Sequence, residues 1–338
     1  MRFLERRDDD FDVVKSFLVV SMIIAHAFQI FYIPIYNKHL TYYVLVGFVF
    51  LSGLTIGSVY NEKLLTKPGV YGWVIISRAL KLLGIFIFAN AIIMLLAPDK
   101  ILQSRELGLT DLLVSALLRD GGARFSFAVL IAIGLTFVGS VALLSWRRHL
   151  IIDFLCWGLM ISALWVIEIT GIFDYYTVKM TIVGLIGVSS GKMLSSVNWG
   201  KIRITLSKWY FAAWACYITY QASLIAFDET WRLNIGHYIN VTIFLLLAVY
   251  LTSYRMGLSN YGAAKLLNKT LAKHMLFAYL FHLIFLRFFA KFIDRGNFPF
   301  AFVVSLITLT ITILVALSIN TLTGKYKALN RTYSLVFR

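Results

Sequence analysis

About ten apolar runs follow one another along this chain of 338 residues, and most have the length of a membrane span. A helix rises about 1.5 Å per residue, so about 20 apolar residues cross the hydrocarbon core of a bilayer. The chain is 60% hydrophobic and 14% charged, whereas a soluble domain is about 45–50% apolar and about 25% charged. The sequence therefore predicts an all-α, polytopic membrane helix bundle.

The predicted spans are residues 12–34, 40–60, 73–97, 125–145, 150–171, 175–194, 209–227, 238–255, 275–293 and 300–321. Residues 1–338 are thus expected to form a single integral membrane domain without a fused soluble domain. The first run carries Lys15 and His26 and is longer than the apolar core of a signal peptide. We expect it to be retained as a spanning helix.

Lysine and arginine are unevenly distributed between the two sides of the predicted bundle. Each segment on the side of the N-terminus carries at least two of them, and together these segments hold more than twice as many as the opposite side. This pattern predicts that both termini are cytoplasmic, and it explains the net charge of +16 without a nucleic-acid-binding face. Cys156 and Cys216 lie in apolar runs and form no disulfide or metal pattern, so no metal is predicted.

The longest predicted outer connection covers residues 98–124. It places leucines at helical spacing between Thr110, a suitable N-cap, and a stop at Gly121–Gly122. The pattern predicts a short amphipathic helix that lies along or dips into the outer surface.

Polar residues share one face of the first span. Asp12, Lys15, Met22, His26 and Gln29 fall on one helical stripe, and Lys15 and His26 are separated by about 16 Å along the axis. Taken by itself, Lys15 fits an anchor whose ammonium group reaches the membrane surface. Taken by itself, His26 fits a hydrogen bond between packed helices. Their common face favours a functional site, because polar groups at this depth are costly.

The second and third spans offer candidate donor-binding residues. Ser52 and Gly53 interrupt a bulky run, and Gly53 with Gly57 forms a small-xxx-small face. Close helix packing explains that face, and room for a narrow acyl chain or pantetheine arm is the alternative. Arg78 and Lys81 open the third span, where they serve either as cytoplasmic anchors or as a phosphate clamp.

The ninth span contains Tyr279, His282 and Arg287. A histidine within a span is often a packing residue, but an arginine this deep faces a partner or an aqueous cavity. Glu168 and Lys179 lie near the outer ends of two consecutive spans, so we predict a structural ion pair between them.

Four of these stretches resemble the acyltransferase 3 family of multipass bacterial membrane acyltransferases. FDVVKSFLVVSMIIAH resembles the family's Asp-x-x-Arg/Lys followed by His, and FVFLSGLTIG resembles its phenylalanine-rich Leu-Ser-Gly element. SRALKLL resembles its basic third-span motif, and YLFHLIF its late Tyr-x-x-His element. The chain departs from the family where Leu82–Gly84 replace a common proline and where ARFSFAVL lacks a tryptophan.

The resemblance implies transfer of an acyl group, usually acetyl from acetyl-CoA, across the bacterial cytoplasmic (inner) membrane to a hydroxyl of a cell-surface or exported glycan. The expected partners are then the lipid bilayer and a glycan or lipid-linked saccharide as acceptor. The expected residues are His26 as general base with Lys15 and Asp12 in the catalytic group, Arg78, Lys81, Ser52 and Gly53 for the donor, and His282, Tyr279, Arg287 and Gln29 for the acceptor. Acetyl or succinyl transfer, direct transfer or an acyl-enzyme, and the oligomeric state all stay open.

Two other functions fit the same composition. A transporter or flippase for a glycan or lipid intermediate also needs polar groups around a path through the membrane. A non-catalytic membrane scaffold needs neither the deep histidine nor the deep arginine.

Overall fold

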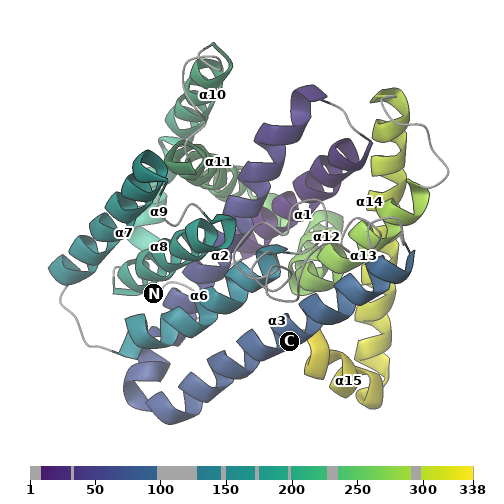
Figure 1. Cartoon of the computed structure of the whole chain (residues 1–338), viewed down its shortest axis with the longest axis horizontal. Coiled ribbons are helices and arrows are strands. Elements are labelled where there is room, and N and C mark those ends of the chain that lie inside the picture. The colour runs from purple at the N-terminus through teal and green to yellow at the C-terminus, as the bar shows by residue number, and fades with distance from the viewer. Residues whose placement is uncertain are drawn as a thin grey trace. The chain divides into compact units, whose positions relative to one another are not determined.

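The computed structural model of the protein describes residues 9–31, 34–96, 128–145, 150–171, 175–196, 199–226, 235–290 and 298–337. Every regular element in these ranges is helical, so the all-α prediction is confirmed (Figure 1). The elements are α1 (Asp9–Ile30), α2 (Pro34–Thr66), α3 (Pro68–Leu96), α6 (Ala128–Ser145), α7 (Leu150–Thr170), α8 (Tyr176–Ser196), α9 (Trp199–Ser207), α10 (Tyr210–Ala226), α11 (Ile235–Met256), the short 3₁₀ helix η1 (Leu258–Asn260), α12 (Gly262–Lys273), α13 (Met275–Phe289), α14 (Phe298–Lys325) and α15 (Lys327–Phe337). The predicted amphipathic helix of residues 98–124 lies outside the described residues.

Helices occupy all ten ranges that the sequence predicts as spans. Among the described residues, six of them are long and apolar enough to cross a membrane: α1, α2, α3, α7, α11 and α14. A seventh candidate is the pair α12 and α13, which is bent by 82°. By helix length and hydropathy, the chain is a multi-pass membrane protein.

The second helix extends beyond its predicted end at residue 60. It continues to Thr66, and α3 begins at Pro68 after the single residue Lys67. Proline disfavours a helical conformation in the residue before it but is well suited to the first position of a helix, so Pro68 ends one helix and begins the next. The last turns of α2, which carry Tyr60 and Lys63, are therefore helical extensions of the apolar run.

The helices cluster into two compact units, which are described separately. The described residues of the first unit fall within Val46–Phe244, and those of the second within Asp8–Leu45 and Leu245–Arg338. The boundaries lie inside α2 and α11.

In the first unit, α8 packs against α2 with their main chains in contact. A Cβ atom added at Gly53 would overlap the carbonyl oxygen of Gly184, and one added at Gly187 would overlap that of Phe50. Small residues are required for such an approach between membrane helices. The backbone of α8 fills the space beside Gly53, so in this structure Gly53 serves helix packing.

Two ion pairs join α8 to α7 within the same unit. Lys179 Nζ lies 3.1 Å from Glu168 Oε1, which confirms the predicted pair. Lys192 Nζ lies 2.9 Å from Asp153 Oδ1, and both side chains are buried. The two helices are therefore tied near both ends of their shared length.

In the second unit, α1 packs against α12, α13 and α14 (Figure 1). The bend between α12 and α13 falls at His274, whose Nδ1 lies 2.6 Å from the hydroxyl oxygen of Tyr333 on α15. The adjacent Lys273 donates a hydrogen bond from Nζ to Oδ1 of Asn320, on α14, at 2.6 Å. Side-chain hydrogen bonds from two adjacent residues thus connect the bend to α14 and α15.

Candidate functional site

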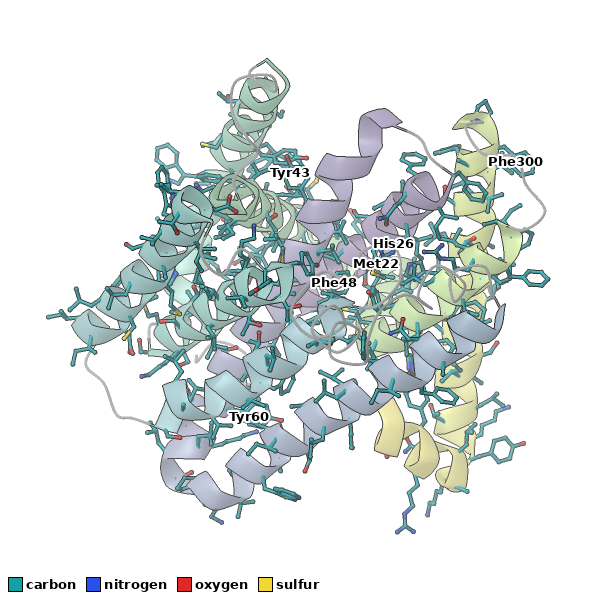
Figure 2. The ribbon with its side chains drawn as sticks, viewed as in Figure 1. Met22, His26, Tyr43, Phe48, Tyr60 and Phe300 are labelled. Atoms are coloured by element: carbon teal, nitrogen blue, oxygen red, sulfur yellow. The ribbon has the colours of Figure 1, made fainter. Side chains whose placement is uncertain are left out.

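Two histidines form a hydrogen-bonded pair inside the second unit. Nδ1 of His26, on α1, lies 2.9 Å from Nε2 of His282, on α13, although 256 positions separate the two residues. Their rings are stacked, with centroids 5.2 Å apart and planes inclined by 19°. Figure 2 labels His26 one turn beyond Met22 on α1. The sequence predicts a role for each histidine but not their contact.

The pair is buried within two apolar helices. His282 has no exposed surface, whereas 8% of His26 is exposed. Neighbouring Met22 and Ala278 are fully buried. A polar group in such a position needs a hydrogen-bond partner, and each ring supplies one to the other. His26 is therefore the less fully buried member of the pair.

His282 makes a second hydrogen bond within its own helix. Its Nδ1 lies 2.7 Å from the carbonyl oxygen of Ala278, one turn earlier on α13. Both ring nitrogens of His282 are thus engaged. Among the described residues, the hydrogen bond of His26 involves Nδ1 and not Nε2.

The other predicted acceptor-side residues lie at different positions around the pair. The Tyr279 ring is buried, with its centroid 6.1 Å from that of His26 and 5.9 Å from that of His282. Arg287 is half-buried on α13, five positions after His282. Gln29 is exposed near the end of α1. The structure therefore places Tyr279 beside the pair and Gln29 on the outside of the helix.

Asp12 and Lys15 lie at the other end of α1. The Lys15 ammonium stands 5.3 Å from the centre of the Phe11 ring, and Asp12 is buried. Eleven positions separate Lys15 from His26, which is a rise of about 16 Å. The predicted catalytic group is thus split, with the histidine at one level of the helix and the charged residues at another.

The same end of α1 is fastened to α12. The Asp9 carboxylate contacts the ammonium groups of Lys265 at 3.2 Å and Lys269 at 3.3 Å. Ser16 Oγ donates a hydrogen bond to the carbonyl oxygen of Asn268 at 3.0 Å. These contacts give the N-terminal part of α1 a structural role in the second unit.

A group of two cations and two tyrosines lies in the first unit, and we call it the cation–tyrosine cluster: Tyr60, Lys63, Tyr71 and Arg78. The Arg78 guanidinium lies 5.5 Å from the Tyr60 ring centre, and the Lys63 ammonium lies 5.6 Å from Tyr60 and 5.9 Å from Tyr71. The tyrosine rings meet edge to face at 6.4 Å. Such cation–π contacts orient the cationic groups.

Sequence reasoning found Arg78 but missed the other three members of this cluster. Tyr60 and Lys63 are separated by three positions and Tyr71 and Arg78 by seven, which are spacings of one helical face. That pattern is the signal available in the sequence. Of the other predicted donor residues, Ser52 and Lys81 are half-buried in the same unit.

The chain matches no protein-family model, no curated protein and no solved structure. In the part of the chain that the structure describes, no three His, Cys, Asp or Glu side chains form a group that could hold a metal ion.

Proposed function

We propose that this protein is a membrane-bound O-acyltransferase, which moves an acyl group, most simply acetyl from acetyl-CoA, to a hydroxyl of a cell-surface or exported glycan. The observation that carries the proposal is the buried pair of imidazoles, in which His26 is the less fully buried ring. Imidazole is the side chain best suited to exchange protons near neutral pH.

The chemical step follows from the position of His26. The ring accepts the proton of the acceptor hydroxyl while that oxygen attacks the thioester carbonyl carbon. The tetrahedral intermediate collapses, the carbon–sulfur bond breaks, and the leaving thiolate takes the proton from His26, so that free CoA and the acylated glycan result. General-base assistance of this kind contributes about 10²–10⁴-fold. Direct transfer requires no nucleophile on the protein, whereas an acyl-enzyme would require one such as Ser52.

The donor phosphates would bind to cations of the first unit. Arg78 offers a planar fork for phosphate oxygens, and Lys63 and Lys81 add ammonium groups. In the proposed topology ten spans cross the bacterial cytoplasmic membrane with both termini inside. The ends of α2 and α3 that carry these cations would then face the compartment that holds acetyl-CoA.

A transporter or flippase for a glycan or lipid intermediate is the second candidate. The 82° bend between α12 and α13 favours it, because broken helices are common at transport sites. Against it, α12 is a lysine-rich amphipathic helix, which suits a position along the membrane surface more than a path through the membrane.

The test supplies acetyl-labelled acetyl-CoA to membranes that contain the protein and measures label in the glycan fraction by mass analysis. Wild-type membranes should label the glycan, and His26→Ala should reduce the rate by about 10²–10⁴-fold at equal protein abundance. Met22→Leu, one turn away on the same buried face of α1, is the matched control and should retain transfer. Glycan movement without label in any sample would refute the enzyme and support the transporter.

A further inference from the structure

We propose that His282 is a positioning residue, which fixes the tautomer of His26 and leaves Nε2 of His26 as the proton-accepting atom. The role of Nε2 in acyl transfer rests on the proposed function. The assignment of the tautomer does not, because it follows from the hydrogen bonds of the pair alone.

The assignment starts from the backbone of α13. The carbonyl oxygen of Ala278 can only accept a hydrogen bond, so the contact at 2.7 Å requires a proton on Nδ1 of His282. A neutral imidazole with a proton on Nδ1 carries a lone pair on Nε2. Nε2 of His282 is therefore the acceptor in the contact at 2.9 Å, and Nδ1 of His26 is the donor.

The same rule fixes the remaining atom. A neutral His26 that carries its proton on Nδ1 has its lone pair on Nε2. No described hydrogen bond uses this atom, and His26 is the less fully buried member of the pair. The carbonyl oxygen of Ala278 thus sets the tautomer of His282, and His282 sets the tautomer of His26.

The competing arrangement has a doubly protonated His282 that donates to both Ala278 and His26. It would place a positive charge on a side chain with no exposed surface, inside an apolar helix that already carries Arg287. Charged groups are most costly in such positions. Two doubly protonated rings are also excluded, because two N–H groups would face each other at 2.9 Å.

The arrangement serves the proposed reaction at the moment of proton transfer. When Nε2 of His26 accepts a proton, its Nδ1–H still donates to His282, and that hydrogen bond becomes charge-assisted. In serine hydrolases a buried carboxylate orients the base and stabilises its charged form. Here a neutral ring orients the base, which avoids burying an anion at membrane depth.

The test is ¹⁵N NMR of histidine-labelled protein in lipid bilayers, where the chemical shifts of the two ring nitrogens distinguish the tautomers. The chain has six histidines, so the spectrum of His26→Gln identifies the signals of His26. We expect a proton on Nδ1 of His26 in the wild type. His282→Leu should abolish the fixed tautomer, and His282→Gln, whose amide oxygen can accept from His26, should preserve it.

Kinetics give the second readout. His282→Leu should lower kcat by about 10²–10⁴-fold with little change in KM, His282→Gln should recover most of kcat, and Leu286→Val, a buried control on α13, should change neither. A proton on Nε2 of His26 in the wild type, or an unchanged tautomer in His282→Leu, overturns the proposal. If His282→Leu does not fold, the wild-type spectrum and His282→Gln decide. A tautomer fixed by His282 in a protein without acyl transfer would support the positioning role and refute the proposed enzyme.

Discussion

The contacts inside the first compact unit differ in kind from those inside the second. In the first unit α2 and α8 meet main chain to main chain at glycines, and ion pairs tie α8 to α7. In the second unit α1 meets its neighbours through side-chain hydrogen bonds, and one of the buried contacts is between two imidazoles. Glycine contacts and ion pairs are fully satisfied within the first unit, so they indicate a scaffold. The imidazole pair adds groups that can exchange protons near neutral pH, and this difference directs attention to the second unit.

The largest effect is expected from a bulky side chain at a glycine of the first unit. Gly187→Leu would collide with the carbonyl oxygen of Phe50, which no change of rotamer can relieve. We expect a loss of about 5 kcal/mol or more, a large share of a typical protein's stability. The measurement is the yield and thermal midpoint of protein in detergent. Gly84→Ala, where a Cβ meets no atom within 4 Å, should be neutral or stabilising, and equal losses in both variants would contradict the packing argument.

Breaking the buried ion pair should have the next largest effect. Lys192→Met leaves the Asp153 carboxylate buried without its cation, and such a change costs about 3–5 kcal/mol. The double variant Asp153→Leu with Lys192→Met removes both charges and should recover most of the stability. A double variant as unstable as the single one would show that the pair does more than neutralise charge.

A smaller effect on substrate use is expected from the cation–tyrosine cluster. If its cations bind the donor phosphates, Arg78→Ala and Lys63→Ala should each raise KM for acetyl-CoA by about tenfold, which corresponds to about 1.4 kcal/mol. Lys67→Ala, an exposed cation beside the cluster, is the control and should leave KM unchanged. An unchanged KM in Arg78→Ala would assign the cluster to packing and make the first unit wholly a scaffold.

The smallest effect is expected at the N-terminal end of α1. Asp9 and its partners Lys265 and Lys269 are partly exposed, with 27% and 39% of the side chains accessible. Ion pairs in such positions contribute about 1 kcal/mol or less. Asp9→Asn should therefore change the free energy of unfolding by no more than this, and the change should shrink in high salt. A loss above about 2 kcal/mol would mean that this contact is as important to the second unit as the buried polar pairs.

The membrane character and the helix positions were predictable from the sequence, because apolar run length is a local property. The ion pair of Glu168 and Lys179 was also predictable, since opposite charges near adjacent ends of consecutive spans are brought together by a short connection. The end of α2 was misplaced by six residues. The apolar run ends at Tyr60, whereas Pro68 sets the boundary of the helix.

The pairing within the site was not predictable in the same way. His26 and His282 were each identifiable as polar groups in apolar helices, but no periodicity connects residues 256 positions apart. Their contact depends on how α1 and α13 pack, which a single sequence does not specify. The start of the ninth span at Met275 was predicted correctly, but the helix before the bend, α12, was not predicted. Residues of α12 are amphipathic rather than apolar, so a search for spanning runs passes over them.

The break at His274 also has a consequence for the bilayer itself. As described, α13 has 15 residues, which corresponds to a rise of about 22 Å, whereas a hydrocarbon core is about 30 Å thick. A helix shorter than the surrounding lipid is accommodated when the lipid thins next to it. We therefore expect a local depression of the membrane beside the histidine-bearing helix, which would bring water closer to the buried pair of histidines.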